Sequence, residues 1–150
     1  MICRKVKTCI SETMAICRYF EESYPEAPTL LGDTPLEKAT IEQWVRWIEF
    51  YFFTPTGMCF QHTSGYFKDR MNPIKEWGED CGKSVNKFMA FLNDHLADRE
   101  YICCDRFTAA DINAFTTVAF ARVVSIRILP EHTHLQAWYD RIKSRPSAQA

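Results

Sequence analysis

The feature that most constrains this chain is a set of apolar stripes whose members recur every three or four residues. That spacing marks one face of an α-helix, whereas a half-buried strand alternates with a period of two. Each stripe therefore predicts an amphipathic helix that buries this face against a core. The four stripes are Ile41, Trp44, Val45, Ile48 and Phe52; Ile74, Trp77, Cys81, Val85, Phe88, Leu92 and Leu96; Ile112, Phe115, Ala119 and Val123; and Leu135, Trp138 and Ile142.

Favourable helix starts precede several of these stripes. Thr34 is followed by Pro35 at the first helical position and by Glu37 at the third, which is the arrangement of a capping box. These local signals indicate where helices begin before any tertiary contact is considered. The same chemistry recurs at Asn72–Pro73 and at Thr133 with Gln136.

Prolines set further limits on the helices. Tyr24 precedes Pro25 and resists helical geometry, so it should end a short helix that starts near Glu12. Pro55 and Gly57 should kink or interrupt the second helix before it resumes. The sequence therefore predicts an all-α fold, a bundle of about five helices. The expected helices span residues 12–24, 35–67, 73–98, 108–123 and 134–144, and only residues 6–10 look like a strand.

Another helix start is predicted at Thr108. Its hydroxyl can accept from the Asp111 N–H, while the Asp111 carboxylate reaches back to the Thr108 N–H. Phe107 and Ile112 occupy the two positions of a hydrophobic staple. Aspartate also favours the positive end of the helix dipole. Together these residues predict a strong helix nucleus.

Charge and cysteine content narrow the function classes. The chain carries 18 basic and 19 acidic residues with no block of one sign, so nothing favours nucleic acid or an anionic membrane as partner. No apolar run reaches the roughly 18 residues of a membrane span, and residues 1–17 lack the pattern of a secretory signal. Seven cysteines without a CxxC spacing, including the neighbours Cys103 and Cys104, favour reduced thiols. We expect a cytoplasmic protein.

Residues 101–115 have the sequence YICCDRFTAADINAF. This segment resembles the YLAGDRFTLADI signature of glutathione transferases, in which the capping box and staple open a buried helix. Cys104 stands where that family usually has glycine. The resemblance implies the helical C-terminal fold of the family. It also implies a structural role for the box and staple residues Phe107, Thr108, Asp111 and Ile112.

A second segment, residues 10–25, resembles the pattern LTESxAIxxYL…P that ends the thioredoxin-like half of the same family. In the family, a Glu-Ser pair at a helix N-terminus holds the γ-glutamyl end of glutathione. The resemblance assigns this role to Glu12 and Thr13, where threonine keeps the hydroxyl of serine. A helix N-terminus offers unpaired N–H groups to a carboxylate, and the acidic side chain can meet an ammonium group. A solvated helix cap is the alternative interpretation.

The resemblance extends to residues 135–150, which are similar to the last helix and tail of bacterial members. It divides the chain into residues 1–26, a remnant of the thioredoxin-like glutathione-binding domain, and residues 27–150, the helical C-terminal domain. A βαβ unit needs about 30 residues, for which residues 1–9 leave no room. We therefore expect this chain to lack the thiol-activating residue and the cis-proline of complete members.

The resemblance also implies where an electrophile would bind, since the family builds that pocket along its long helix. Arg46, Tyr51 and His62 are candidates to face the pocket, with core packing or solvent as the alternative for each. His132 and His134 could touch a metal, but two histidines without a third ligand are more typical of a surface turn. No metal site is expected.

Two functional hypotheses follow. In the first, the chain is a glutathione transferase family protein, truncated and weakly active or inactive as it stands. Complete members conjugate glutathione, as co-substrate, to small electrophilic molecules. In the second, it is a non-catalytic helical binding or dimerisation module derived from such an enzyme. Both predict a homodimer, since family members usually dimerise, and a conjugation assay separates them.

Overall fold

The structure is a computed structural model that describes residues 9–149. A π-helical turn, η1 (Glu49–Phe53), joins α2 to α3. The described residues contain no strand, which confirms the all-α prediction. Residues 9 and 10 of the predicted strand are not in a strand, and residues 6–8 lie outside the described part. The other elements are α1 (Thr13–Ser23), α2 (Pro35–Ile48), α3 (Thr54–Thr63), α4 (Lys75–His95), α5 (Ala109–Ala121), the 3₁₀ turn η2 (Arg122–Val124), α6 (Thr133–Lys143) and the 3₁₀ turn η3 (Pro146–Ala148).

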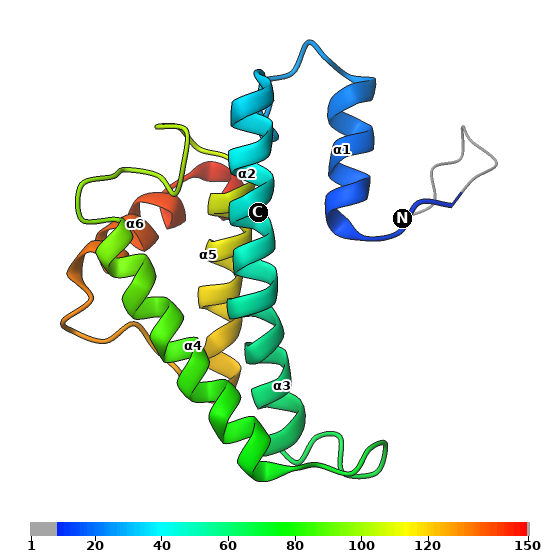
Figure 1. The fold of residues 1–150 in the computed structure, drawn as a ribbon, viewed down its shortest axis with the longest axis vertical. Coiled ribbons are helices and arrows are strands. Elements are labelled where there is room, and N and C mark those ends of the chain that lie inside the picture. The colour runs from blue at the N-terminus through cyan, green and yellow to red at the C-terminus, as the bar shows by residue number, and fades with distance from the viewer. Residues whose placement is uncertain (1–8, 150) are drawn as a thin grey trace.

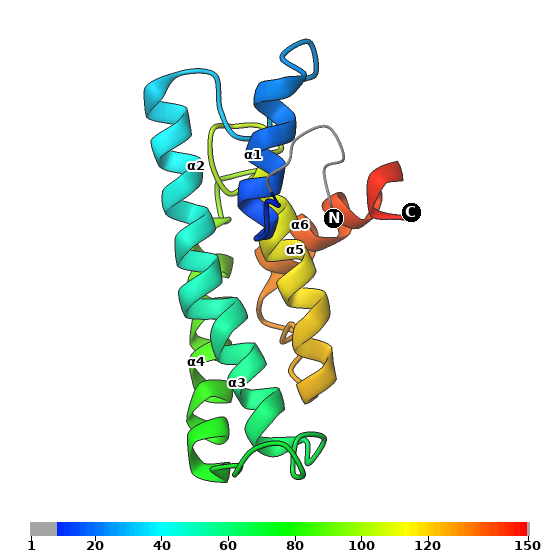
Figure 2. The same cartoon turned by 90° about the vertical axis from the view of Figure 1, so that its right-hand side faces the viewer.

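The helices α2 and α3 run in line as one long rod (Figure 1). Along this rod, α4 packs mainly on α3 and α5 packs on α2, while α6 contacts both α4 and α5. Helix α1 lies beside α2 in Figure 1 and in front of α5 in Figure 2, and an irregular segment joins it to α2. None of its residues is buried. Helix α1 therefore contacts the bundle without burying a residue of its own, and Met14 is its member that packs against the core.

The core confirms the first and last apolar stripes, whose members are all buried. In the second stripe the members from Cys81 to Leu96 are buried, but Ile74 and Trp77 are each 53% exposed. Their predicted burial is wrong because α4 meets the last turn of α3 at Gly78, where an added Cβ would lie 2.8 Å from the Cβ of His62. Before Gly78 the Ile74 N–H still reaches His62 Nδ1 at 2.9 Å, but the Ile74 and Trp77 side chains stay largely in solvent.

The third stripe does not form the buried face of α5. Ala119 and Val123 are exposed, whereas Ile112 and Phe115 are only partly buried. Because α5 carries apolar side chains on most sides, periodicity could not identify the face that packs inward. Its small side chains allow a close approach to α2. The buried residues of α5 are Ala109, Ala110, Asp111, Ala114, Thr117, Val118 and Ala121.

The predicted interruption at Pro55 takes a milder form. The helix continues through the proline, but the turn before it widens, so that the Thr54 N–H bonds to the Glu49 carbonyl five residues back. Proline lacks the N–H that would bond to Tyr51 and its ring crowds that carbonyl, which favours a wider turn just upstream. The Thr56 hydroxyl donates to the Phe52 carbonyl at 2.7 Å and compensates within this segment.

Helix ends follow local signals in some cases only. Thr34 forms its predicted capping box with Glu37. The box predicted at Thr133 is absent, because α6 begins at Thr133 itself and His132 is the capping residue. Instead Asn93 of α4 supplies an amide oxygen to the N–H groups of the first α6 turn, at 3.1 and 3.2 Å. Two other predicted ends shift: α3 stops at Thr63 rather than residue 67, and α4 starts at Lys75 rather than residue 73.

Candidate functional site

A pocket of about 330 Å³ lies where the N-terminus of α1 faces α2 and α5. It brings three of the predicted site residues together: Glu12, which precedes α1, Thr13, which begins it, and Arg46 of α2. Residues that the sequence did not single out complete the wall, among them Glu49, Phe53, Asn113 and Thr117. The pocket is therefore built by segments more than thirty residues apart in the chain.

Glu12 and Thr13 open α1. The Glu12 carbonyl accepts from the Ile16 N–H at 3.0 Å, which closes the first helical turn. Within the described residues no side chain caps this helix, so its first N–H groups remain available to an anion. Glu12 has φ 69° and ψ 125°, a strained region for a residue with a Cβ. Both side chains are exposed.

Arg46 is held between two carboxylates. Its Nε pairs with Glu42 Oε1 at 3.1 Å, and its Nη1 pairs with Glu49 Oε2. Glu42 also pairs with Arg18 of α1 at 3.2 Å. Partly exposed pairs contribute at most about 1 kcal/mol each, so these contacts mainly orient the Arg46 guanidinium at the pocket wall.

Polar groups of α5 close the opposite side of the pocket. The Thr117 hydroxyl donates to the Asn113 carbonyl at 2.7 Å, and the Thr116 hydroxyl donates to the Ile112 carbonyl at 2.9 Å. Both hydroxyl protons are thus used on the helix backbone, so these hydroxyl oxygens can act towards a ligand only as acceptors. The Asn113 amide contacts Met14 Sδ of α1 at 3.8 Å.

Two other predicted pocket residues lie elsewhere. Tyr51 is 60% exposed in the π-helical turn and does not line this pocket. His62 accepts the Ile74 N–H on its Nδ1 at 2.9 Å and so anchors the start of α4. The structure gives His62 a structural contact, and its role towards an electrophile stays a prediction.

The buried Asp111 side chain accepts several hydrogen bonds, and it forms the predicted capping box with Thr108. It accepts from the N–H groups of Thr108 and Ile102 and from the Trp138 indole, each at 3.0 Å. Burial raises the pKa of Asp111, while the bonds from Trp138 and the backbone oppose that rise. The box joins the start of α5 to α6 and to the preceding turn.

The staple residues beside this box are both partly buried. The Arg145 guanidinium lies 3.8 Å from the centroid of the Phe107 ring, a cation–π contact from the C-terminal segment. A direct contact between Phe107 and Ile112 stays a prediction.

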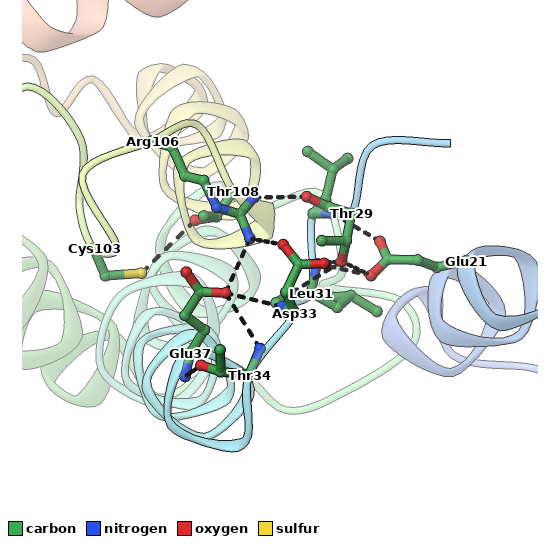
Figure 3. A network of polar contacts seen from close by, with 11 residues as sticks. Glu21, Thr29, Leu31, Asp33, Thr34, Glu37, Cys103, Arg106 and Thr108 are labelled. Atoms are coloured by element: carbon green, nitrogen blue, oxygen red, sulfur yellow. Dashed lines mark hydrogen bonds and ion pairs between the residues drawn. The ribbon is translucent and has the colours of Figure 1, made fainter. Parts of the chain in front are cut away.

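A polar network attaches α1 to the bundle (Figure 3). Glu21 of α1 accepts from the Thr29 hydroxyl and from the Leu30 and Leu31 N–H groups, the latter two at 2.8 and 3.1 Å. Arg106, in the turn before α5, donates to the Thr29 carbonyl at 2.7 Å and pairs with Glu37 of α2 at 3.5 Å. Sequence reasoning missed this network because it joins distant segments through single side chains.

Residues 9–149 were also compared with the requirements of a metal site and of a membrane-spanning helix. They contain no group of three or more His, Cys, Asp or Glu side chains placed to hold a metal ion. Of the two histidines near the start of α6, His132 is buried and His134 is exposed. Among these residues, no helix is both long and apolar enough to cross a bilayer.

Comparisons with known proteins agree with this architecture. The family model of the glutathione S-transferase C-terminal domain matches residues 75–141. Glutathione S-transferase 2 of Saccharomyces cerevisiae is 33% identical over 144 residues, which cover 95% of this chain and 61% of that protein. This chain therefore spans less than two thirds of that relative.

Solved structures give the same result. The crystal structure of Gtt2 from Saccharomyces cerevisiae matches with a TM-score of 0.91 at 30% identity, covering 99% of this chain and 72% of that one. A glutathione S-transferase domain-containing protein from Marinobacter aquaeolei VT8 matches with a TM-score of 0.90 at 30% identity, covering 98% and 72%. The order of the helices, the capping box before α5 and these similarities lead to one assignment: the chain belongs to the glutathione S-transferase family.

Proposed function

We propose that this chain supplies one wall of a glutathione site and thereby serves the conjugation of glutathione to small electrophiles. The observation that carries the proposal is the shared pocket of Glu12, Thr13 and Arg46. In this pocket the uncapped start of α1 can bind a carboxylate through its free N–H groups, and the acidic side chains can bind an ammonium group. The γ-glutamyl end of glutathione carries both groups on one carbon.

The charges of the pocket support this orientation. Glu12 and Glu49 are acidic, and Arg46 is already paired with Glu42 and Glu49. A free anion would therefore bind at the N–H groups of α1 rather than at Arg46. The ligand ammonium would then lie towards Glu12 and Glu49.

The pocket does not by itself offer thiol activation. None of the described residues that line it is tyrosine, serine or cysteine. Activation of a thiol requires a positioned donor or positive field that favours the thiolate. We therefore propose that this chain binds glutathione weakly and conjugates it slowly or not at all, whereas a complete enzyme would supply the missing group.

The proposal is tested by titrating the chain with glutathione and following amide shifts by NMR, beside a conjugation assay with an aryl halide. A site for one end of a flexible tripeptide should bind with a Kd of about 1 mM, or about −4.1 kcal/mol, or more weakly. Shifts should concentrate in the first turn of α1. Thr13→Ala should weaken binding, whereas Ser23→Ala, which removes a hydroxyl at the other end of α1, should not.

Two results would contradict the proposal. Shifts confined to residues away from the α1 start would place glutathione elsewhere. Turnover that survives in the chain alone and is abolished by Thr13→Ala would show that thiol activation is present after all. The alternative of a non-catalytic module is not favoured, because the Saccharomyces cerevisiae relative named above is a glutathione S-transferase.

Association and location belong to the same proposal. We propose that the protein forms a homodimer, since large apolar side chains such as Phe50 and Phe91 are 57% and 45% exposed. We also propose a cytoplasmic location, with which the free thiols are consistent. The division into residues 1–26 and 27–150 stays a prediction, and its boundary falls between α1 and α2.

A further inference from the structure

Two neighbouring cysteines lie in the turn between α4 and α5, outside the pocket described above. Cys103 and Cys104 are both free thiols. Cys103 is buried and Cys104 is partly buried. Figure 3 shows Cys103 directed at Thr108, whose hydroxyl oxygen lies 3.7 Å from the Cys103 sulfur. Neither thiol has a role in the glutathione site.

The backbone at this turn is unusual for the residues it contains. Cys104 has φ 61° and Asp105 has φ 48°, so two successive residues with a Cβ are left-handed. That conformation costs a residue with a Cβ about 1–2 kcal/mol, whereas glycine adopts it freely. A strained residue that glycine could replace is a reason to seek a function for its side chain.

What the Cys104 side chain adds is a second thiol beside the first. The two thiols belong to successive residues, one buried and one partly buried. Burial, opposed by the Thr108 hydrogen bond and reinforced by the nearby Cys104 thiol, raises the pKa of Cys103 to about 12. Cys103 is thus kept as a neutral thiol, while Cys104 is the more accessible partner.

We propose that Cys103 and Cys104 form a dithiol site for trivalent organic arsenicals of the type R–As(OH)₂. Two As–O bonds break and two As–S bonds form. Each thiol proton leaves with one hydroxide as water, so two water molecules are released. Arsenic stays trivalent and no electron acceptor is needed.

The pair matches the valence of this ligand. An arsenic atom with one carbon substituent needs two sulfur partners, and these residues are adjacent in the chain. The first bond forms at Cys104, which is partly exposed, and the second at Cys103 is then intramolecular. Linking two bonds in this way raises affinity by about 100-fold or more over a single thiol. Because the thiolate is the nucleophile, the second bond should form faster as pH rises.

The test uses phenylarsine oxide with the reduced, folded full chain and intact-mass spectrometry. We expect one arsenical per chain, with two thiol protons lost. The adduct should survive excess monothiol, which strips arsenic that is bound through a single sulfur, and should be removed by a vicinal dithiol. Absence of a monothiol-resistant adduct would overturn the proposal.

Variants locate the site. Cys104→Gly removes one sulfur and also relieves the left-handed strain, so loss of fold should not confuse the result. In the presence of monothiol, the affinity of this variant for the arsenical should be about 100-fold lower than that of the wild type. Cys81→Ala is the matched control, because Cys59 and Cys81 are another two buried thiols. Burial is the main cause that raises the pKa of Cys81, and the nearby Cys59 thiol adds to it. An adduct that persists in Cys104→Gly, or that is lost in Cys81→Ala alone, would overturn the proposal.

Discussion

The Trp138 indole N–H donates to Asp111 Oδ1 across 3.0 Å, and this bond joins α6 to the first turn of α5. Both residues are buried, with Trp138 at 1% and Asp111 at 0% exposure. The carboxylate also receives the Ile102 and Thr108 N–H groups. One side chain therefore caps a helix, fixes the turn before it and orients the last helix of the bundle.

Replacement of Asp111 by alanine should be more costly than loss of an ordinary helix cap, which costs about 1 kcal/mol. It would leave three buried N–H donors without an acceptor, and each such donor costs about 1–3 kcal/mol. We expect the free energy of unfolding to fall by about 3 kcal/mol or more, measured by urea denaturation. Asp140→Ala, at an exposed carboxylate that pairs with Gln136, is the control and should change it by less than about 0.5 kcal/mol. A loss of about 1 kcal/mol or less for Asp111→Ala would mean that the other donors find new partners.

Asp111 should also shape the pH dependence of stability. Burial raises its pKa in the folded state, so folding favours the protonated form. Its contribution is greatest below the unfolded pKa of about 3.9 and is lost as pH rises through the folded pKa. As the pH falls from about 7 to about 4, the wild type should therefore gain stability relative to Asp111→Asn. Urea denaturation at both pH values measures this difference. A relative loss on acidification would mean that the hydrogen bonds outweigh burial.

Cys104→Gly should stabilise the protein. The substitution removes the left-handed strain at φ 61°, worth about 1–2 kcal/mol, and this gain exceeds the added entropy of a glycine in the unfolded chain. We expect a net gain of about 0.5–1 kcal/mol by thermal or urea unfolding. Ser84→Gly, in the exposed middle of α4, is the control and should destabilise by about 0.5–1 kcal/mol. If Cys104→Gly and Ser84→Gly lowered the free energy of unfolding equally, the backbone at Cys104 would not be strained.

Two helical glycines should respond oppositely to alanine. A Cβ at Gly57 would meet nothing within 4 Å, so Gly57→Ala should stabilise α3 by about 1 kcal/mol. At Gly78 the same Cβ would lie 2.7 Å from Thr63 Cγ2 and 2.8 Å from His62 Cβ, so Gly78→Ala should cost about 1–3 kcal/mol despite its better helix propensity. Unfolding measurements on both variants test the crossing of α3 and α4. A Gly78→Ala variant that is more stable than the wild type would mean that α3 and α4 do not cross closely at Gly78.

Self-association gives a further check. Sedimentation equilibrium at micromolar concentration should report a dimer or larger species, because burying exposed aromatic side chains drives association. The apparent mass should fall on dilution, and the unfolding midpoint should rise with protein concentration. A monomer at every micromolar concentration would contradict the proposed dimer.

The sequence alone determined the number and order of the helices, because helical periodicity and capping are local properties. The stripe from Ile41 to Phe52 and the boxes at Thr34 and Thr108 could be identified within short windows, and the structure forms them. The short string around Asp111 also carried the family resemblance. Local chemistry was sufficient for the two boxes because their paired residues lie three positions apart in the chain.

Tertiary structure decided the features that depend on which elements meet. The buried face of α5 could not be identified because several of its faces are apolar, and packing against α2, α3 and α6 decided which residues are buried. Asn93 caps α6 from 41 residues away, and Arg106 reaches Thr29 from 77 residues away. Glu49 joins Glu12 at the pocket for the same reason. Such contacts follow from how helices cross in space, and no short stretch of sequence records that geometry.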